Sequence, residues 1–168
     1  MDIKIIGLGG IGSVLCDEIC RFINYSIDFS YIVLIDGDSY EVKNYERQNF
    51  TDLGNKAVIK KQEIRRQFSR LNVDSVDEFV NEENIGGIIR NDDFIFLGVD
   101  NHKTRMIVSN YCRTLENVTL ISGGNDYING NVQLYIRKGG LDLTPDLCAY
   151  HPEIDNPRDK LPTEMSCE

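Results

Sequence analysis

The sequence predicts a doubly wound, mostly parallel α/β sheet. Three observations carry this prediction: a short apolar run that leads into closely spaced glycines, a second apolar run that ends in an aspartate, and strand-like and helix-like stretches that alternate along the 168 residues. A chain of this length can bury the core of one α/β domain and is too short to indicate two. We therefore expect one domain with an irregular C-terminal tail.

A glycine-rich turn occupies the first dozen residues. The apolar run 3–6 predicts a buried strand, and the spacing of the apolar residues that follow predicts an amphipathic helix. The expected apolar face of this helix comprises Ile11, Leu15, Ile19, Phe22 and Ile23. Between strand and helix stand Gly7, Gly9, Gly10 and Gly12. Glycines let the backbone approach a ligand closely and helix N-terminal N–H groups attract phosphate, so the turn indicates a phosphate site; tight packing is the alternative.

A second buried strand is expected over residues 31–35, directly before Asp36. With the first strand and helix it forms a βαβ unit of the Rossmann-like type. Asp36 follows the glycine turn at about the separation where such folds place a carboxylate on the ribose hydroxyls. A turn aspartate in Asp36-Gly37-Asp38 is locally equally plausible, and the preceding glycine turn favours the ribose role.

An ordered polar run then separates this chain from an ordinary dehydrogenase. It contains D-x-D at Asp36 and Asp38, then N-x-x-R-Q at Asn44–Gln48, and Leu53-Gly54-Asn55-Lys56-Ala57 and residues 99–105 (VDNHKTR) follow. From residue 3 to about residue 133, these motifs in this order resemble the ThiF/MoeB/ubiquitin-activating (E1-like) superfamily. The resemblance implies ATP- and magnesium-dependent adenylation of the C-terminal carboxylate of a ubiquitin-like or sulfur-carrier protein that ends in glycine. It also implies a homo- or heterodimer.

Adenylation brings a carboxylate and a triphosphate together, so cations are required. Arg47 offers a planar fork for phosphate oxygens, Lys56 a mobile point charge, and Asp100 an oxygen ligand for magnesium. The alternatives are solvated side chains and, at Asp100-Asn101, a strand-end turn or a helix N-cap. The resemblance implies that Asn44 and Gln48 also line the nucleotide pocket. The expected nucleotide-binding set is then Gly7, Gly9, Gly10, Gly12, Asp36, Asp38, Asn44, Arg47, Gln48, Lys56 and Lys60.

Lys60, one helical turn after Lys56, is in that set as the alternative to Lys56. The superfamily commonly spaces its glycine three residues before the lysine, whereas Gly54 lies two before Lys56. The helix expected here buries Ile64, Phe68 and Leu71. It also carries a basic strip, which we interpret as a solvated face, with an acidic partner as the alternative. The strip comprises Lys56, Lys60, Lys61, Arg65, Arg66 and Arg70.

The alternation of elements continues to residue 138, and we assign residues 1–138 to the adenylation domain. Strands are expected at 73–80, 94–97, 118–121 and 130–136, and helices at 82–90 and 101–115, with Ser122-Gly123-Gly124 closing the strand 118–121. All four prolines lie in residues 139–168, which lack apolar periodicity. We expect a loop there rather than a core element, resembling a truncated crossover region.

Cys148, His151 and Cys167 are the soft ligands of that tail. Three interpretations are open, in this order: ordinary thiols, a nucleophile at Cys167 that accepts the activated carboxylate as a thioester, and a zinc site. Zinc prefers four ligands, so it would need a further donor. Cys16 and Cys20, four apart on the first helix, are expected to be core thiols. Five cysteines without framework spacing fit reduced thiols.

Composition excludes several classes of function. The net charge of −9 argues against general nucleic-acid binding, and no apolar run is long enough to cross a bilayer. With no signal peptide before the first strand, we expect a cytoplasmic protein. Two further hypotheses stay open: a non-catalytic partner or scaffold of a fuller activating subunit, and an NAD-dependent Rossmann oxidoreductase, which the N-x-x-R-Q run disfavours.

Overall fold

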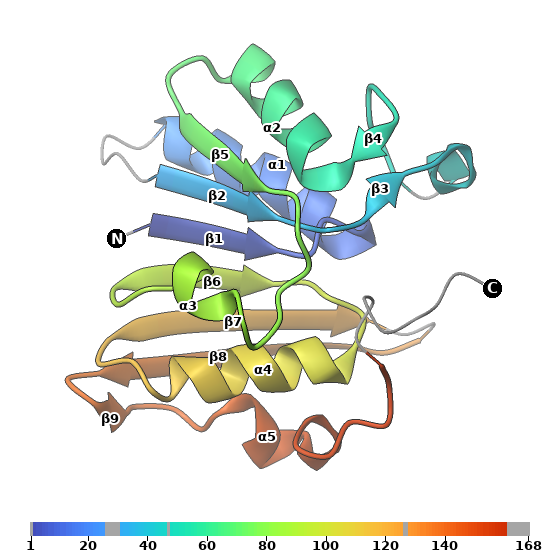
Figure 1. Cartoon of the computed structure of the whole chain (residues 1–168). Helices are drawn as coiled ribbons and strands as arrows, with labels where there is room; N and C mark the ends of the chain where they lie inside the picture. Colours follow the sequence, from blue (N-terminus) through green and yellow to red (C-terminus); the bar gives the residue numbers. More distant parts are fainter. Residues whose placement is uncertain (1, 26–30, 47, 126–127, 161–168) are drawn as a thin grey trace.

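The computed structural model describes residues 2–25, 31–46, 48–125 and 128–160. Its main sheet has the strand order β5-β2-β1-β6-β7-β8-β9, in which β5 to β7 are parallel neighbours while β8 and β9 run antiparallel (Figure 1). This confirms the predicted doubly wound, mostly parallel fold. The strands are β1 Asp2–Ile6, β2 Tyr31–Ile35, β5 Asn72–Val76, β6 Asp93–Leu97, β7 Val118–Asn125, β8 Gly130–Lys138 and β9 Leu141–Asp142.

Helices cover the two faces of the sheet in separate groups (Figure 1). On one face, α1 (Gly10–Tyr25) and α2 (Lys56–Gln67) pack over β1, β2 and β5. On the other face lie α3 (Ile85–Ile88), α4 (His102–Cys112) and α5 (Leu147–Tyr150). Each group buries its own apolar cluster, so the sheet separates two cores. No helix among the described residues has the length and apolarity needed to cross a membrane.

The buried face of α1 differs from the expected one. Phe22 is 72% exposed, whereas Cys16 and Cys20 are fully buried. The reason lies at the start of the helix, where Gly12 must face the backbone of Gly7 in the turn. That contact sets the helix phase, and positions four and eight residues later therefore face the sheet. The prediction that both cysteines are core thiols is confirmed, and the prediction for Phe22 is wrong.

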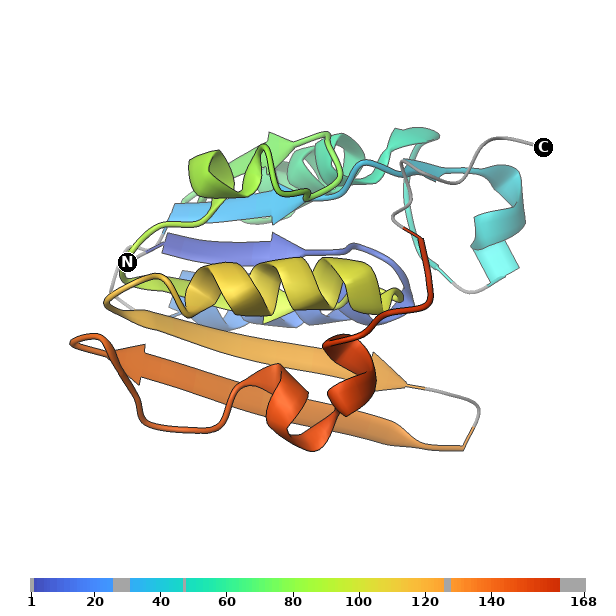
Figure 2. The same ribbon diagram turned by 60° about the horizontal axis from the view of Figure 1, so that its bottom comes forward.

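A small second sheet lies beyond the carboxyl ends of β1 and β2. It pairs β3 (Ser39–Tyr40) with β4 (Gly54–Asn55), and the 3-10 helix η1 (Val42–Glu46) lies between them in the chain. Figures 1 and 2 both show β3 and η1 projecting past the main sheet at this edge. The N-x-x-R-Q run therefore begins in an appendage of the fold and not in a core element.

The last third of the chain departs from expectation in two places. Strand β7 continues through Ser122-Gly123-Gly124 to Asn125, because these residues pair with β8. Beyond residue 139, α5 and the 3-10 helix η2 (Pro152–Ile154) pack against α4. Leu147 and Ile154 are 0% and 3% exposed within the same core cluster as α4, so the expectation of no core element is wrong for these two residues.

Candidate active site

A cleft of about 1410 Å³ opens at the carboxyl ends of β1, β2, β6 and β7, where doubly wound sheets bind their ligands. Most of the predicted site residues line it. Gly12 and Lys60 do not, and Arg47 and Cys167 lie outside the described residues. The predicted residues along the cleft are Gly7, Gly9, Gly10, Asp36, Asp38, Asn44, Gln48, Lys56 and Asp100.

The glycines of the turn have two different requirements. Gly7 has a φ of 87°, a left-handed conformation that side chains disfavour. A Cβ at Gly12 would lie 1.8 Å from the Gly7 carbonyl oxygen, so any side chain there collides with backbone. A Cβ on Gly9 or Gly10 would meet nothing within 4 Å. Gly7 and Gly12 are therefore needed by the turn itself, whereas Gly9 and Gly10 leave open space at the cleft.

The Asp36 carboxylate is already engaged by the backbone. One oxygen accepts from the Leu8 N–H at 2.6 Å and the other from the Asp38 N–H at 2.8 Å. Burial raises the pKa of Asp36, and the two backbone hydrogen bonds oppose that rise. The turn interpretation of Asp36 is thus observed, because the side chain joins the end of β2 to the glycine turn. A ribose contact stays a prediction.

Lys56 is held at the cleft by Asp38 and Asn55. Its side chain is 8% exposed and its ammonium donates to the Asp38 carboxylate. Asn55 caps α2 by accepting from the Val58 N–H at 3.0 Å, and its amide donates to the Asp36 carbonyl at 2.8 Å. One asparagine therefore begins the helix and fixes the D-x-D loop beside it. This arrangement places a buried cation at the N-terminus of α2, where the helix dipole adds positive potential.

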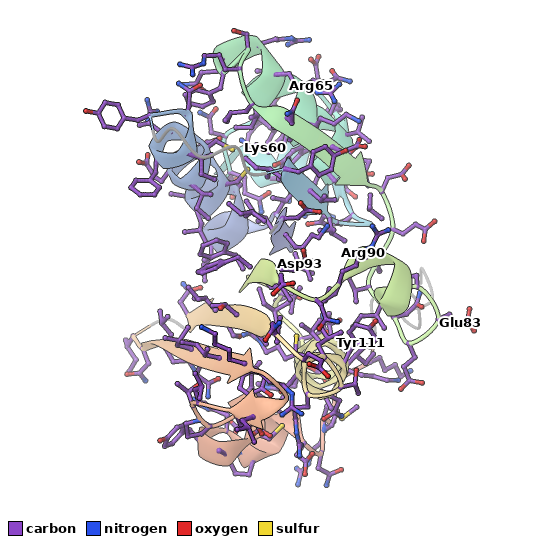
Figure 3. All side chains as sticks on the ribbon, turned by 90° about the vertical axis from the view of Figure 1, so that its left-hand side faces the viewer. Lys60, Arg65, Glu83, Arg90, Asp93 and Tyr111 are labelled. Atoms are coloured by element: carbon purple, nitrogen blue, oxygen red, sulfur yellow. The ribbon has the colours of Figure 1, made fainter. Side chains whose placement is uncertain are left out.

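Lys60 has a different setting. Its ammonium lies 2.7 Å from Glu63 and 3.5 Å from Asp17 on α1, and the side chain is 3% exposed. Figure 3 shows Lys60 between α1 and α2, with Arg65 farther out on α2. The expected solvated basic strip is therefore wrong for Lys56 and Lys60, because both are buried and pair with acidic residues of the same chain. It holds for the exposed side chains of Arg66 and Arg70, whereas the guanidinium of Arg65 donates to the Val73 carbonyl.

Arg105 is a cleft residue whose importance sequence reasoning missed. It is 8% exposed and donates to the Ser122 hydroxyl, to the Val99 carbonyl, and to the Gly123 carbonyl at 2.8 Å. Burial lowers its pKa, and the negative charge of Asp100 opposes that change. The guanidinium thus joins the carboxyl ends of β6 and β7. The only signal in the sequence was its place at the end of the 99–105 motif.

The start of α4 forms the middle of the cleft. Asn101 caps the helix by accepting from the Thr104 N–H at 2.8 Å, which confirms the N-cap interpretation for the Asp100-Asn101 pair. Asp100 is exposed at the cleft beside this cap. From the tail, the Asp159 carboxylate accepts from the backbone N–H groups of His102 and Lys103. The tail therefore anchors on the same helix end.

The far wall of the cleft comes from β8 and the tail. His151 Nδ1 lies 2.7 Å from a Glu153 oxygen, and Asn131 approaches Nε2 of His151 at 3.3 Å. All three residues line the cleft.

Burial raises the pKa of the Cys148 thiol. Within the described ranges no three His, Cys, Asp or Glu side chains converge as metal ligands, so Cys148 and His151 are not joined there into a zinc site.

Comparison with known protein families identifies the fold's lineage. The family model described as "ThiF family" matches residues 1–163. The chain belongs to the ThiF family. The resemblance read from the D-x-D, N-x-x-R-Q and VDNHKTR segments is thereby confirmed.

Curated relatives of this ThiF-family chain are longer proteins. It is 27% identical over 82% of its length to "Ubiquitin-like modifier-activating enzyme 5" of Aedes aegypti, covering 37% of that protein. It is 29% identical over 92% of its length to "Probable molybdopterin-synthase adenylyltransferase" of Porphyra purpurea, covering 40% of it. The chain thus spans less than half the length of these relatives.

A solved structure agrees with the fold of this ThiF-family chain. It is that of E. coli tRNA N6-threonylcarbamoyladenosine dehydratase, TcdA, in complex with AMP. The match has a TM-score of 0.58 and 26% identity, and it covers 73% of this chain and 51% of that chain.

Proposed function

We propose that this chain binds ATP in the cleft and adenylates the C-terminal carboxylate of a ubiquitin-like or sulfur-carrier protein. The observation that carries the proposal is the position of Lys56, a buried cation that lines the same cleft as the open glycines Gly9 and Gly10. A phosphate group over the glycine turn would meet both a helix N-terminus and this ammonium. The AMP in the related dehydratase structure and the names of the curated relatives support the same substrate classes.

In the proposed reaction a carboxylate oxygen attacks the α-phosphorus of ATP. A bond forms between these two atoms, the bond from the α-phosphorus to the bridging oxygen breaks, and pyrophosphate leaves with its electron pair. The reactants are both anions, so the site must offset their repulsion. Lys56 supplies a fixed positive charge, and we assign Arg47 a second contact with the phosphates. Asn44 and Gln48 are assigned to hydrogen bonds with the nucleotide.

Magnesium is the metal that this reaction class implies, and Asp100 fits it. A carboxylate is the oxygen donor that Mg²⁺ prefers, and Asp100 is an exposed carboxylate on the cleft. Bound there, the ion would neutralise charge on the phosphates as pyrophosphate departs. Asp38, which already engages Lys56, is a second carboxylate on the same cleft.

The proposal divides the chain into two segments of unequal length. We infer that residues 1–138 are the ATP-binding adenylation domain and that residues 139–168 are a crossover-type segment beside the acyl substrate. We assign Asn131, Gln133 and His151, on the far wall, to contacts with the carrier protein's C-terminal residues. The proposal includes a homo- or heterodimer, as well as Cys167 as a thioester acceptor to be tested by mass spectrometry.

ATP–pyrophosphate exchange tests the reaction. Purified protein is incubated with Mg-ATP, labelled pyrophosphate and synthetic peptides that end in Gly-Gly, with amide-capped versions of the same peptides as controls. We expect exchange only with a free C-terminal carboxylate. Calorimetry in parallel should show that ATP binds much more tightly than NAD. Tighter NAD binding would revive the oxidoreductase hypothesis, and tight ATP binding without exchange would favour a non-catalytic partner.

A further inference from the structure

Three aromatic rings stack in the small appendage beside the cleft. The Tyr40 and Phe50 rings have centroids 4.2 Å apart and planes 8° apart, and Phe50 and Tyr45 are also 4.2 Å apart, at 20°. Phe50 is therefore the central ring. Tyr40, on one side, is 2% exposed, whereas Tyr45, on the other side, is 54% exposed. The stack extends from the buried Tyr40 of β3 to the exposed Tyr45 of η1.

This stack belongs to a core of its own. Tyr40 and Phe50 cluster with Ile59 of α2, apart from the two clusters that fill the faces of the main sheet. The small sheet beside it has two residues in each strand. Secondary structure this short depends on side-chain packing for its stability. The three rings are therefore the main apolar contact that fixes η1 against β3.

The residues that η1 presents to the cleft depend on its backbone. Asn44 in η1 accepts from the Glu41 N–H at 2.8 Å with its side chain, and its carbonyl accepts from the Gln48 N–H at 2.9 Å. Both Asn44 and Gln48 line the cleft. A change in the path of η1 would therefore move both polar side chains together.

Lys56, the lysine that lines the cleft, lies close to the same aromatic stack. Lys56 Nζ lies 6.0 Å from the centroid of the Tyr40 ring, within the range of a cation–π contact. The Lys56 backbone N–H donates to the Asp38 carbonyl at 2.8 Å, next to β3. The Tyr40 ring thus stacks on Phe50 and also lies near the Lys56 ammonium.

We propose that Phe50 and Tyr45 are positioning residues for the nucleotide: their stack on Tyr40 fixes η1 so that Asn44 and Gln48 face the cleft that Lys56 also lines. Neither ring needs to touch the ligand. This inference rests on the proposed function, since it assigns the nucleotide to this cleft. It predicts that loss of the rings weakens nucleotide binding without unfolding the main sheet.

The experiment uses the full chain and four variants. Phe50→Leu removes the central ring and keeps an apolar side chain in its place. Tyr45→Leu removes the exposed ring, and because Tyr45 is 54% exposed this change should not unfold the protein. Tyr45→Phe keeps the ring and serves as the rescue. Phe22→Leu is the matched control, because Phe22 is an exposed aromatic residue of α1 that does not line the cleft.

Three readouts are measured on each variant: the ATP dissociation constant by calorimetry, amide hydrogen exchange without nucleotide, and the kinetics of ATP–pyrophosphate exchange. We expect Phe50→Leu to raise the dissociation constant about 5- to 20-fold and Tyr45→Leu about 2- to 5-fold, the scale of lost aromatic pairs. Tyr45→Phe and Phe22→Leu should match the wild type. In Phe50→Leu and Tyr45→Leu, amide hydrogen exchange should accelerate in η1 and not in β1 or β6. In pyrophosphate exchange, KM for ATP should rise more than kcat falls.

The outcomes separate the inference from the proposed function. Unchanged protection of η1 in Phe50→Leu would overturn the positioning role, whatever the nucleotide data show. Faster exchange in η1 with an unchanged ATP dissociation constant would overturn it too. A wild-type protein that binds no ATP would instead overturn the proposed function. The amide hydrogen exchange rates of η1 would then still show whether the stack orders η1.

Discussion

Lys56 contacts Asp38 twice, through its backbone N–H to the Asp38 carbonyl at 2.8 Å and through its ammonium to the Asp38 carboxylate. The pair joins the start of α2 to the loop after β2, on the cleft side of the glycine turn. Because the ammonium already has a partner, an incoming phosphate meets a charge whose position is set. Preorganised charge of this kind is what stabilises charge that develops in a transition state.

Lys56 and Lys60 should separate chemistry from stability. We expect Lys56→Ala to lower the turnover of ATP–pyrophosphate exchange about 100-fold, with a smaller change in ATP affinity. Lys60→Met is the matched control, since it removes the neighbouring buried lysine, which does not line the cleft. It should destabilise the fold and leave turnover per folded molecule nearly unchanged. Abolished exchange in Lys60→Met with retained exchange in Lys56→Ala would reverse the assignment.

The glycine turn offers a matched pair of alanine substitutions. Gly12→Ala places a methyl group 1.8 Å from the Gly7 carbonyl oxygen, so we expect it to cost about 3 kcal/mol or more of unfolding free energy. Gly10→Ala meets nothing within 4 Å and should leave the urea midpoint almost unchanged. Its methyl group projects at the cleft, so ATP should bind more weakly. Equal stability of the two variants would contradict the geometry of the turn.

Asp36 should make stability depend on pH. Burial raises its pKa in the folded chain, so the folded state holds the proton more tightly than the unfolded state. Its contribution to stability is therefore greatest below about pH 3.8 and declines as pH rises through the folded pKa. Asp36→Asn should lose this decline. Urea unfolding between pH 3.5 and 7 checks the difference; parallel curves for both proteins would exclude the buried titration.

Arg105 should resist even a conservative change. Arg105→Lys replaces a fork that reaches three acceptors with one ammonium, and it leaves the carbonyls of Val99 and Gly123 without their donor. We expect a loss on the order of 2–4 kcal/mol of unfolding free energy. Arg66→Lys, an exposed position on α2, is the control and should stay within about 0.5 kcal/mol. Chemical denaturation of both variants decides the point.

Sequence patterning was sufficient to predict the elements whose burial is visible in their own residues. Strands β1 and β2 are buried along nearly their whole length, and apart from Lys4 in β1 both consist of apolar residues over their buried part. The end of β7 was misjudged, because its pairing with β8 overrides the glycines that indicated a stop. The face of α1 was misjudged at Phe22, because a contact between Gly12 and Gly7 sets the helix phase.

The site was predictable as a set of residues and not as a set of contacts. Motif order brought Lys56, Asp38 and Asp100 to one cleft, yet burial of a lysine depends on acids elsewhere in the chain. Asp17, on α1, is such a partner for Lys60. Leu147 and Ile154 stand alone among prolines and have no periodicity, so their burial against α4 had no local signal.

The buried cysteines are natural probes of the opening of the two cores. Cys16, Cys20 and Cys112 are fully buried, so a thiol reagent reaches them only when a core opens. Cys148 is half-buried in α5, the short helix that precedes the far wall of the cleft. In a Cys167→Ser background, the labelling rate at Cys148 therefore reports how tightly α5 packs on the core, and the rates at the other three report opening of the cores that bury them. One thiol reagent can thus follow two motions of this protein through two separate labelling rates.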